Sequence, residues 1–240
     1  DARAIAEAVR APDMRLVACK TVEQQDVQAL YVLRAARVRE RTALCNQLRG
    51  LLAEYGIVLP QGLSAVRKRL PELLEEAENG LSDFFRPLLA RSYEQLQESD
   101  RHVEFYTQQL KEHARHNEAV QRLQTIPGFG PIVASVFHAA VGNGQAFGKG
   151  RDVSAALGLV PKQHSSGGKN VLLGISKRGD RYLRSLLVHG ARSVVRQAGR
   201  KDDRLSRWIN QLKAKRGINK AAVALANKMA RIGWAILSQN

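Results

Sequence analysis

The stretch LQTIPGFGPIVASVFHAAVG, residues 123–142, decides how the second half of the chain folds. Its turn contains Gly128 and Gly130, whose missing side chains allow the backbone to approach a partner closely. Pro131 follows, at a position that suits the first turn of a helix, and apolar residues then recur with helical spacing. We therefore predict a helix from about Pro131 to Val141, preceded by a turn of the helix-hairpin-helix kind.

Such a turn offers backbone N–H groups and a helix N-terminus to a phosphate, without a charged side chain. The alternative is a tight connection between two helices that binds nothing.

Two polar segments follow this turn. GLVPKQHSSGGKN, residues 158–170, is predicted to be a loop whose glycines admit a phosphate and whose serines offer hydroxyls. GISKRGDRYLRSLLVHGAR, residues 174–192, predicts a basic helix with Ser176 as its N-cap. Asp152 and Asp180 stand apart from other acidic residues, so we interpret them as cap or ion-pair residues rather than metal ligands.

The charge of the chain is concentrated in its second half. The net charge is +16, but residues 1–120 hold 17 Lys/Arg and 18 Asp/Glu, whereas residues 121–240 hold 21 and 4. Such asymmetry indicates that the second half binds a polyanion. The alternative is a solvated basic surface with no partner. No apolar run approaches the roughly 20 residues of a membrane span, so a nucleic acid is the favoured partner.

The first half predicts two long helices. Thr21 and Gln24 have the spacing of a capping box. From there a helical pattern of apolar residues continues to Tyr55. Its stripe alternates by four and three residues: Val27, Tyr31, Arg34, Val38, Arg41, Cys45, Leu48, Leu52 and Tyr55. We expect the two arginines to pack their stems and to extend their charged ends into water.

The second long helix is predicted from near Ser82 to about His116. Apolar residues recur in it every seven positions: Leu89, Leu96, Val103 and Leu110. A shorter helix, Leu63–Glu76, lies between the two and contains Pro71. This order predicts an antiparallel coiled-coil hairpin that serves as a dimerisation or spacing arm. An ordinary helical bundle is the alternative.

The remaining segments are shorter or less informative. Residues 2–10 predict the end of a helix, and the chain starts in that pattern without a methionine, which we interpret as the middle of a longer protein. Residues 14–19 are interpreted as an edge strand. Helices are expected around Trp208 and over Ala221–Leu237, with Trp208 and Trp234 as packing residues rather than base-stacking platforms.

Cys19 and Cys45 have no metal-like spacing. This favours a reducing compartment, the cytoplasm, and no disulfide.

The expected fold class is therefore mainly α. Residues 21–120 form a long antiparallel coiled-coil arm, and residues 121–240 form a small, basic, helical domain with a helix-hairpin-helix-like motif.

Three ordered segments of the second half resemble one family. IPGFG (126–130), GLVPKQHSSGGK (158–169) and GISKRGDRYLRSLLVHGAR (174–192) are similar to transposases of the insertion-sequence family "one-ten", of the Piv and MooV type. NQLRGLLAEYGIVLP (46–60) looks like the arm of that family, and DARAIAEAVR (1–10) resembles the end of its N-terminal RuvC-like domain. Residues 1–20 are therefore expected to be the end of such a domain.

The resemblance implies a DNA transposase or recombinase with a serine nucleophile and a DEDD set of Mg²⁺-binding carboxylates. The serine of the family matches Ser166, with Ser165 as the alternative nucleophile, and Asp1 matches the last DEDD aspartate, a metal ligand only in the complete protein. A structured bridge RNA is implied as a guide, and double-stranded DNA as the substrate. The residues expected to bind phosphate or nucleic acid are Gly128, Gly130, Lys169, Lys177, Arg178, Arg181 and Arg184.

Other interpretations remain open at this point. His164 is a candidate general base, although its place beside the serine in sequence does not bring its ring to the hydroxyl. The chain alone is expected to be inactive because three carboxylates are missing. A non-catalytic binder of structured DNA or RNA is the alternative function, and an inactive gene remnant is a further one. A homo-oligomer through the arm is a hypothesis.

Overall fold

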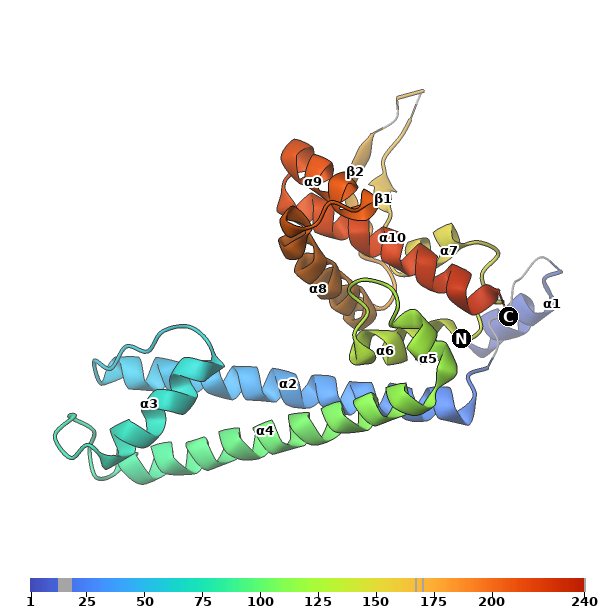
Figure 1. Ribbon diagram of the computed structural model, residues 1–240. Coiled ribbons are helices and arrows are strands. Elements are labelled where there is room, and N and C mark those ends of the chain that lie inside the picture. Colours follow the sequence, from blue (N-terminus) through green and yellow to red (C-terminus); the bar gives the residue numbers. More distant parts are fainter. Residues whose placement is uncertain (13–18, 167, 170, 240) are drawn as a thin grey trace. The chain divides into compact units, whose positions relative to one another are not determined.

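The computed structural model describes residues 1–12, 19–166, 168–169 and 171–239. Within them the chain is mainly helical (Figure 1), which confirms the predicted fold class. The strand expected at 14–19 falls on residues outside the described ranges, apart from Cys19. The elements are α1 (Ala2–Arg10), α2 (Val22–Glu54), α3 (Leu63–Glu75), α4 (Phe85–His116), α5 (Glu118–Leu123), α6 (Pro131–Val141), α7 (Gly150–Ala156), β1 (Pro161–Gln163), β2 (Leu172–Ile175), α8 (Arg181–Gln197), the 3₁₀ turn η1 (Ala198–Arg200), α9 (Arg204–Arg216) and α10 (Ile218–Ser238).

The chain divides into two compact units. One comprises Asp26–Asn117 and the other comprises Asp1–Gln25 with Glu118–Asn240. We call them the arm and the basic unit. None of the described helices is long and apolar enough to cross a membrane.

In the arm, α2 and α4 run antiparallel and are joined by two polar contacts. The Arg34 Nε–H donates to Thr107 Oγ1 at 2.8 Å, and the Arg41 guanidinium meets Asp100 at 3.0 Å. Arg41 lies seven residues after Arg34 on α2, and Asp100 lies seven residues before Thr107 on α4. The two antiparallel helices therefore keep one register between these contacts. Each guanidinium, which we expected to extend into water, has a partner on the facing helix, and both arginines remain partly exposed.

The apolar pattern of the arm agrees with its core. All four heptad positions of α4 are buried, and so are Cys45, Leu48 and Leu52 of α2. Burial raises the pKa of the Cys45 thiol, so the side chain stays a neutral apolar group.

The capping box predicted at the start of α2 is also formed. Thr21 N donates to Gln24 Oε1 at 2.9 Å, and Gln24 N donates to Thr21 Oγ1 at 3.2 Å.

The far end of the arm is closed by α3, which stays helical through Pro71. Its apolar face joins the core of α2 and α4 through Val66, Leu70 and Leu73, all of them buried. The Arg86 guanidinium donates to four carbonyl oxygens at the C-terminal end of α3 and just beyond it, those of Leu73, Leu74, Glu76 and Ala77. It thereby satisfies the C-terminal carbonyls that a helix leaves without partners.

The basic unit is built around α10. This helix packs against α7, α8 and α9, and small residues allow the close approach. Its fully covered positions are Ala221, Ala222, Leu225, Ala226, Met229, Ala230, Gly233 and Leu237.

Acidic side chains of the basic unit cap two of its helices. Asp180 accepts the amides of Tyr182 and Leu183 at the start of α8, which confirms its interpretation as a cap. Ser176, the expected cap, lies before the helix, and its amide donates to Val160 O instead. Asp203 caps α9, and its pKa is lowered by the hydrogen bond from the Ser206 hydroxyl and by the backbone amides that it accepts.

Candidate nucleic-acid interface

The predicted loop of residues 158–170 contains one strand, β1, which pairs with β2 just beyond the loop in an antiparallel hairpin; the other described residues of 158–170 form no strand. Pro161 pairs with Ile175 and Gln163 with Leu172, with an irregularity between them. Figure 1 shows the hairpin projecting from the helices of the basic unit. The side chains of its two strands are exposed, except for the half-buried Ile175 at its base. In the sequence, the only sign of these strands is the short apolar run that follows the serine-glycine turn. That run has too few residues to show the alternation typical of a strand.

The tip of this hairpin carries both candidate serines. Ser165 Oγ accepts the amide of Val171 at 3.3 Å, and the His164 amide donates to Val171 O at 2.9 Å. These bonds tie the first serine to the facing strand. The Ser166 carbonyl accepts the Lys169 amide at 3.0 Å, but its hydroxyl has no partner among the described residues. Both serines are exposed, and Ser166 is the one of the two whose Oγ has no hydrogen-bond partner among the described residues.

The base of the hairpin is fixed by close backbone contacts. The Lys177 amide donates to Gly158 O at 3.1 Å, and a Cβ at Gly158 or Gly179 would overlap backbone atoms of the other segment. Both glycines have positive φ. Lys177 itself has φ 58, an uncommon conformation for a residue with a side chain. A hollow of about 520 Å³ lies beside this base, and Lys162 and Arg178 both line it.

The glycine turn before α6 has the predicted geometry at its helix start. Gly130 is the residue before α6 and Pro131 occupies the first turn, so the predicted helix bounds are confirmed. The order of α5, turn and α6 is consistent with a helix-hairpin-helix arrangement. Around Gly130 the space for a Cβ is open.

Gly128 serves the interior of the unit. It has φ +92, and a Cβ there would lie 2.8 Å from Met229 Cε and 2.9 Å from Gly190 O. The lack of a side chain here therefore permits close packing against α8 and α10, while the expected phosphate contact of the Gly128 backbone stays a prediction.

The candidate cations differ in what they face. Lys169, Lys177, Arg178 and Arg181 are exposed. Arg184 is only 9% exposed, and its Nη1 donates to Leu157 O at 3.0 Å and to Arg178 O at 2.8 Å. The expected phosphate role of Arg184 is thus corrected to a structural one: it holds the segments on either side of the hairpin together.

The roles of Arg181 and Arg184 can be separated with matched substitutions. Arg184→Met is expected to lower the free energy of unfolding by about 2–4 kcal/mol, because two carbonyls lose a charged donor. Arg181→Met is expected to change it by less than about 0.5 kcal/mol, since the residue is exposed. Denaturant unfolding followed by circular dichroism measures both. Equal effects of the two variants would contradict this distinction.

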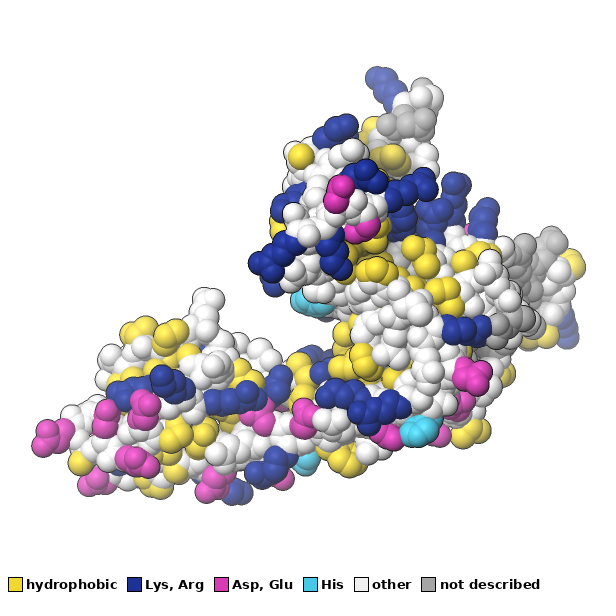
Figure 2. All heavy atoms as spheres, in the orientation of Figure 1, with side chains coloured by type: hydrophobic (Ala, Val, Ile, Leu, Met, Phe, Trp, Pro, Cys, Tyr) yellow, Lys and Arg dark blue, Asp and Glu magenta, His cyan; other side chains and the backbone are white. Residues whose placement is uncertain are grey.

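The surface of the basic unit carries the charge that the sequence predicted. Figure 2 shows dark blue Lys and Arg side chains over α8 and α9 with few acidic ones, whereas those of the arm alternate in sign. Asp180 and Asp203, two of the four acidic residues of 121–240, are both engaged in capping helix N-termini.

No described group of three or more His, Cys, Asp and Glu residues has an arrangement that would hold a metal ion. Asp1, the predicted ligand, is exposed and precedes α1. The described residues therefore do not fit a metal site by themselves.

Comparison with known proteins places this hairpin and its flanking helices in a family. Residues 120–206 match the Transposase IS116/IS110/IS902 family. The whole chain is 48% identical to the transposase for insertion sequence element IS1111A of Coxiella burnetii and covers 66% of that protein. It is 45% identical to a probable family 20 transposase of Pseudomonas aeruginosa and 42% identical to the transposase for insertion sequence element IS1328 of Yersinia enterocolitica, covering 71% of each.

The chain belongs to this family of insertion-sequence transposases. It spans about two thirds of the length of these curated relatives, 66% and 71% of the first two. The matched residues run from the end of α5 to the start of α9, so they contain the glycine turn, the hairpin and the basic helix α8.

Proposed function

We propose that this transposase cuts and rejoins DNA with the Ser166 hydroxyl as its nucleophile. The observation that carries the proposal is the exposed Ser166 Oγ at the tip of the hairpin, next to a serine whose hydroxyl is already engaged by Val171. A projecting hairpin whose Ser166 hydroxyl has no partner among the described residues suits attack on a large substrate that no closed pocket would admit.

The proposed step is a transesterification. Ser166 Oγ attacks a DNA phosphorus, an Oγ–P bond forms, and the bond from phosphorus to one DNA oxygen breaks. The hydroxyl proton passes to a base, and the departing DNA oxygen takes up a proton. The phosphoserine link conserves the ester, so that a hydroxyl of a second strand can displace the serine and rejoin the DNA.

Cations near the hairpin would stabilise the charge that develops on the phosphate. Lys169 lies on the tip, while Lys177, Arg178 and Arg181 follow the second strand, and all four are exposed. Gly130 at the start of α6 is a further candidate for a backbone contact to phosphate. His164 remains a candidate general base because it lies on the same hairpin as Ser166. Its backbone amide donates to Val171 O.

For the complete protein we propose a Mg²⁺ site to which Asp1 contributes, together with carboxylates of a RuvC-like domain. Bound Mg²⁺ would supply electrophilic activation of the phosphate. The partners that we propose are double-stranded DNA of the element ends and target, and a structured bridge RNA that selects them.

We also propose that the arm joins copies of the protein. Large apolar side chains exposed at its far end support this, since Val58 is 82% and Phe84 80% exposed. Sedimentation at increasing concentration tests it, and a monomer throughout would contradict it.

Binding of DNA by the chain is expected to fall steeply with salt. Four phosphate contacts by the exposed cations would lower the affinity roughly a hundredfold between about 50 and 200 mM salt. Fluorescence anisotropy with a labelled duplex measures this slope. A slope near zero would contradict phosphate binding by the basic unit.

The nucleophile is tested by trapping. The complete transposase is incubated with element-end DNA and its RNA, and a protein–DNA adduct is sought after denaturation. The proposal requires that the adduct disappear in Ser166→Ala while DNA binding persists.

A further inference from the structure

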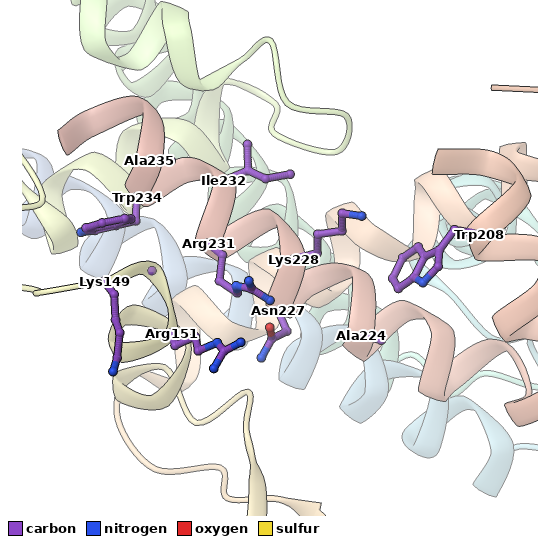
Figure 3. A pocket seen from close by; sticks show the side chains of 11 residues that line it. Lys149, Arg151, Trp208, Ala224, Asn227, Lys228, Arg231, Ile232, Trp234 and Ala235 are labelled. Atoms are coloured by element: carbon purple, nitrogen blue, oxygen red, sulfur yellow. The ribbon is translucent and has the colours of Figure 1, made fainter. Parts of the chain in front are cut away.

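A second basic feature of the molecule lies apart from the hairpin tip, on the face of α10. A groove of about 630 Å³ is formed there by α7, α9 and α10 (Figure 3). We call it the cationic groove and define it by Lys149, Arg151, Trp208, Asn227, Lys228 and Arg231. All of α10, and all of these residues except the first two, lie beyond the matched residues 120–206.

The groove brings together cations from distant parts of the sequence. The cause is Gly150: a Cβ at this position would lie 3.1 Å from both Cα and O of Arg231. The absence of a side chain therefore lets the start of α7 rest on the backbone of α10, which carries Lys149 and Arg151 to Arg231. Two further bonds fix this contact, from Ser154 Oγ to Asn227 O and from Asn227 Nδ2 to Leu159 O, each 3.2 Å.

The groove contains four cations, Lys149, Arg151, Lys228 and Arg231, and no carboxylate among its lining residues. No Asp or Glu lines the groove, and none of the four forms an ion pair with a residue that the structure describes. Figure 3 shows the ends of Arg151, Asn227 and Arg231 converging in one part of the groove. Like charges held on rigid helices repel one another, and a bound anion removes that repulsion. The arrangement thus favours a phosphate.

The aromatic residues of the groove have different roles. Trp234 packs: its Nε1–H donates to Gly144 O at 3.0 Å, as expected for a structural tryptophan. Trp208 is half-buried, and the Lys228 ammonium lies 4.8 Å from its ring centroid. No hydrogen bond of its indole N–H to a described residue occurs. A phosphate that attracts Lys228 would uncover the ring of Trp208 for a flat apolar group.

We propose that the cationic groove binds an unpaired stretch of a nucleic-acid strand, with phosphates on Arg151, Arg231 and Lys228 and a base against Trp208. A duplex could place phosphates on the cations but no base against Trp208, because its bases are already stacked on one another. An unpaired strand satisfies both. The inference does not depend on Ser166 as the nucleophile, because it concerns binding alone.

The test uses the full chain and labelled oligonucleotides of about 12 residues, within the size range of single-strand sites. The probes are oligo(dT), oligo(U) and a DNA duplex of equal length. Trp208→Ala is expected to weaken binding of a single strand about tenfold, which is within the range for loss of one stacked base, and to leave duplex binding within about twofold. Tighter binding of oligo(dT) or of oligo(U) assigns the strand to DNA or RNA, and either supports the proposal.

Two further variants make the result specific. Arg151→Gln with Arg231→Gln is expected to lower the salt slope for the single strand by about two. Lys213→Gln with Lys215→Gln removes the same charge from exposed positions of α9 outside the groove, and should leave the quenching of tryptophan fluorescence by oligo(dT) unchanged. A loss of less than about twofold for Trp208→Ala, with an unaltered thermal transition, would overturn the proposal, as would equal losses for strand and duplex.

Discussion

Ser166→Ala is expected to lower formation of the covalent protein–DNA adduct by at least about a thousandfold in the complete transposase, because no other group replaces an attacking hydroxyl. Duplex and RNA binding should change by less than about threefold, since the neutral hydroxyl contributes little to contacts that cations dominate. Strand exchange, measured as joined product, should fall with the adduct.

Ser165→Ala is the matched control for this substitution. It removes a hydroxyl one residue away that accepts the Val171 amide at 3.3 Å. We expect a reduction of only a few-fold, caused by a looser tip of the hairpin. If Ser165→Ala removes the adduct and Ser166→Ala keeps it, the nucleophile is Ser165. If neither affects strand exchange, the serine mechanism is wrong and the basic unit only binds nucleic acid.

Gly128→Ala is expected to destabilise the basic unit by about 2–5 kcal/mol, the sum of a left-handed backbone cost and an overpacking cost. A methyl group at this position would lie 2.9 Å from Gly190 O, and φ is +92. The neighbouring carbonyl is part of α8 and has no freedom to rotate away. Differential scanning calorimetry should therefore show a lower transition temperature for the basic unit.

Gly130→Ala is the control in the same turn. Its φ is −77 and no atom lies within 4 Å of the added Cβ, so we expect a change within about 0.5 kcal/mol or a slight gain from reduced chain entropy. The backbone N–H is retained, and DNA binding should persist. Equal losses of stability in the two variants would contradict the packing role of Gly128.

The helices of this protein were predictable because their information is local. The bounds predicted for α6, Pro131–Val141, agree with the structure, and the four heptad leucine and valine positions of α4 are buried as expected. The capping box at Thr21 is formed by two residues three apart. Each of these features depends on a few consecutive turns of one helix, so a periodic pattern suffices to locate it.

The hairpin and the groove were not predictable in the same way. The strands β1 and β2 have three and four residues, too few for a period, and they exist through pairing with each other. Ser176 and Asp180 both suit an N-cap, and the tertiary position of the segment selected Asp180 because the Ser176 amide is held by Val160. Composition indicated that the basic half meets a polyanion, but not where.

The sequence by itself therefore determined the helical elements, the uneven charge and the serine turn, since each is written in neighbouring residues. Only the tertiary structure decided which cations are exposed and which are buried. Arg181 and Arg184 are three residues apart on α8, yet one is exposed and the other donates to two carbonyls in the interior. Lys149 and Arg151 line the same groove as Arg231 because Gly150 has no side chain to keep α7 from the backbone of α10. The physical reason is that burial and distance depend on contacts between remote segments, which no local period encodes.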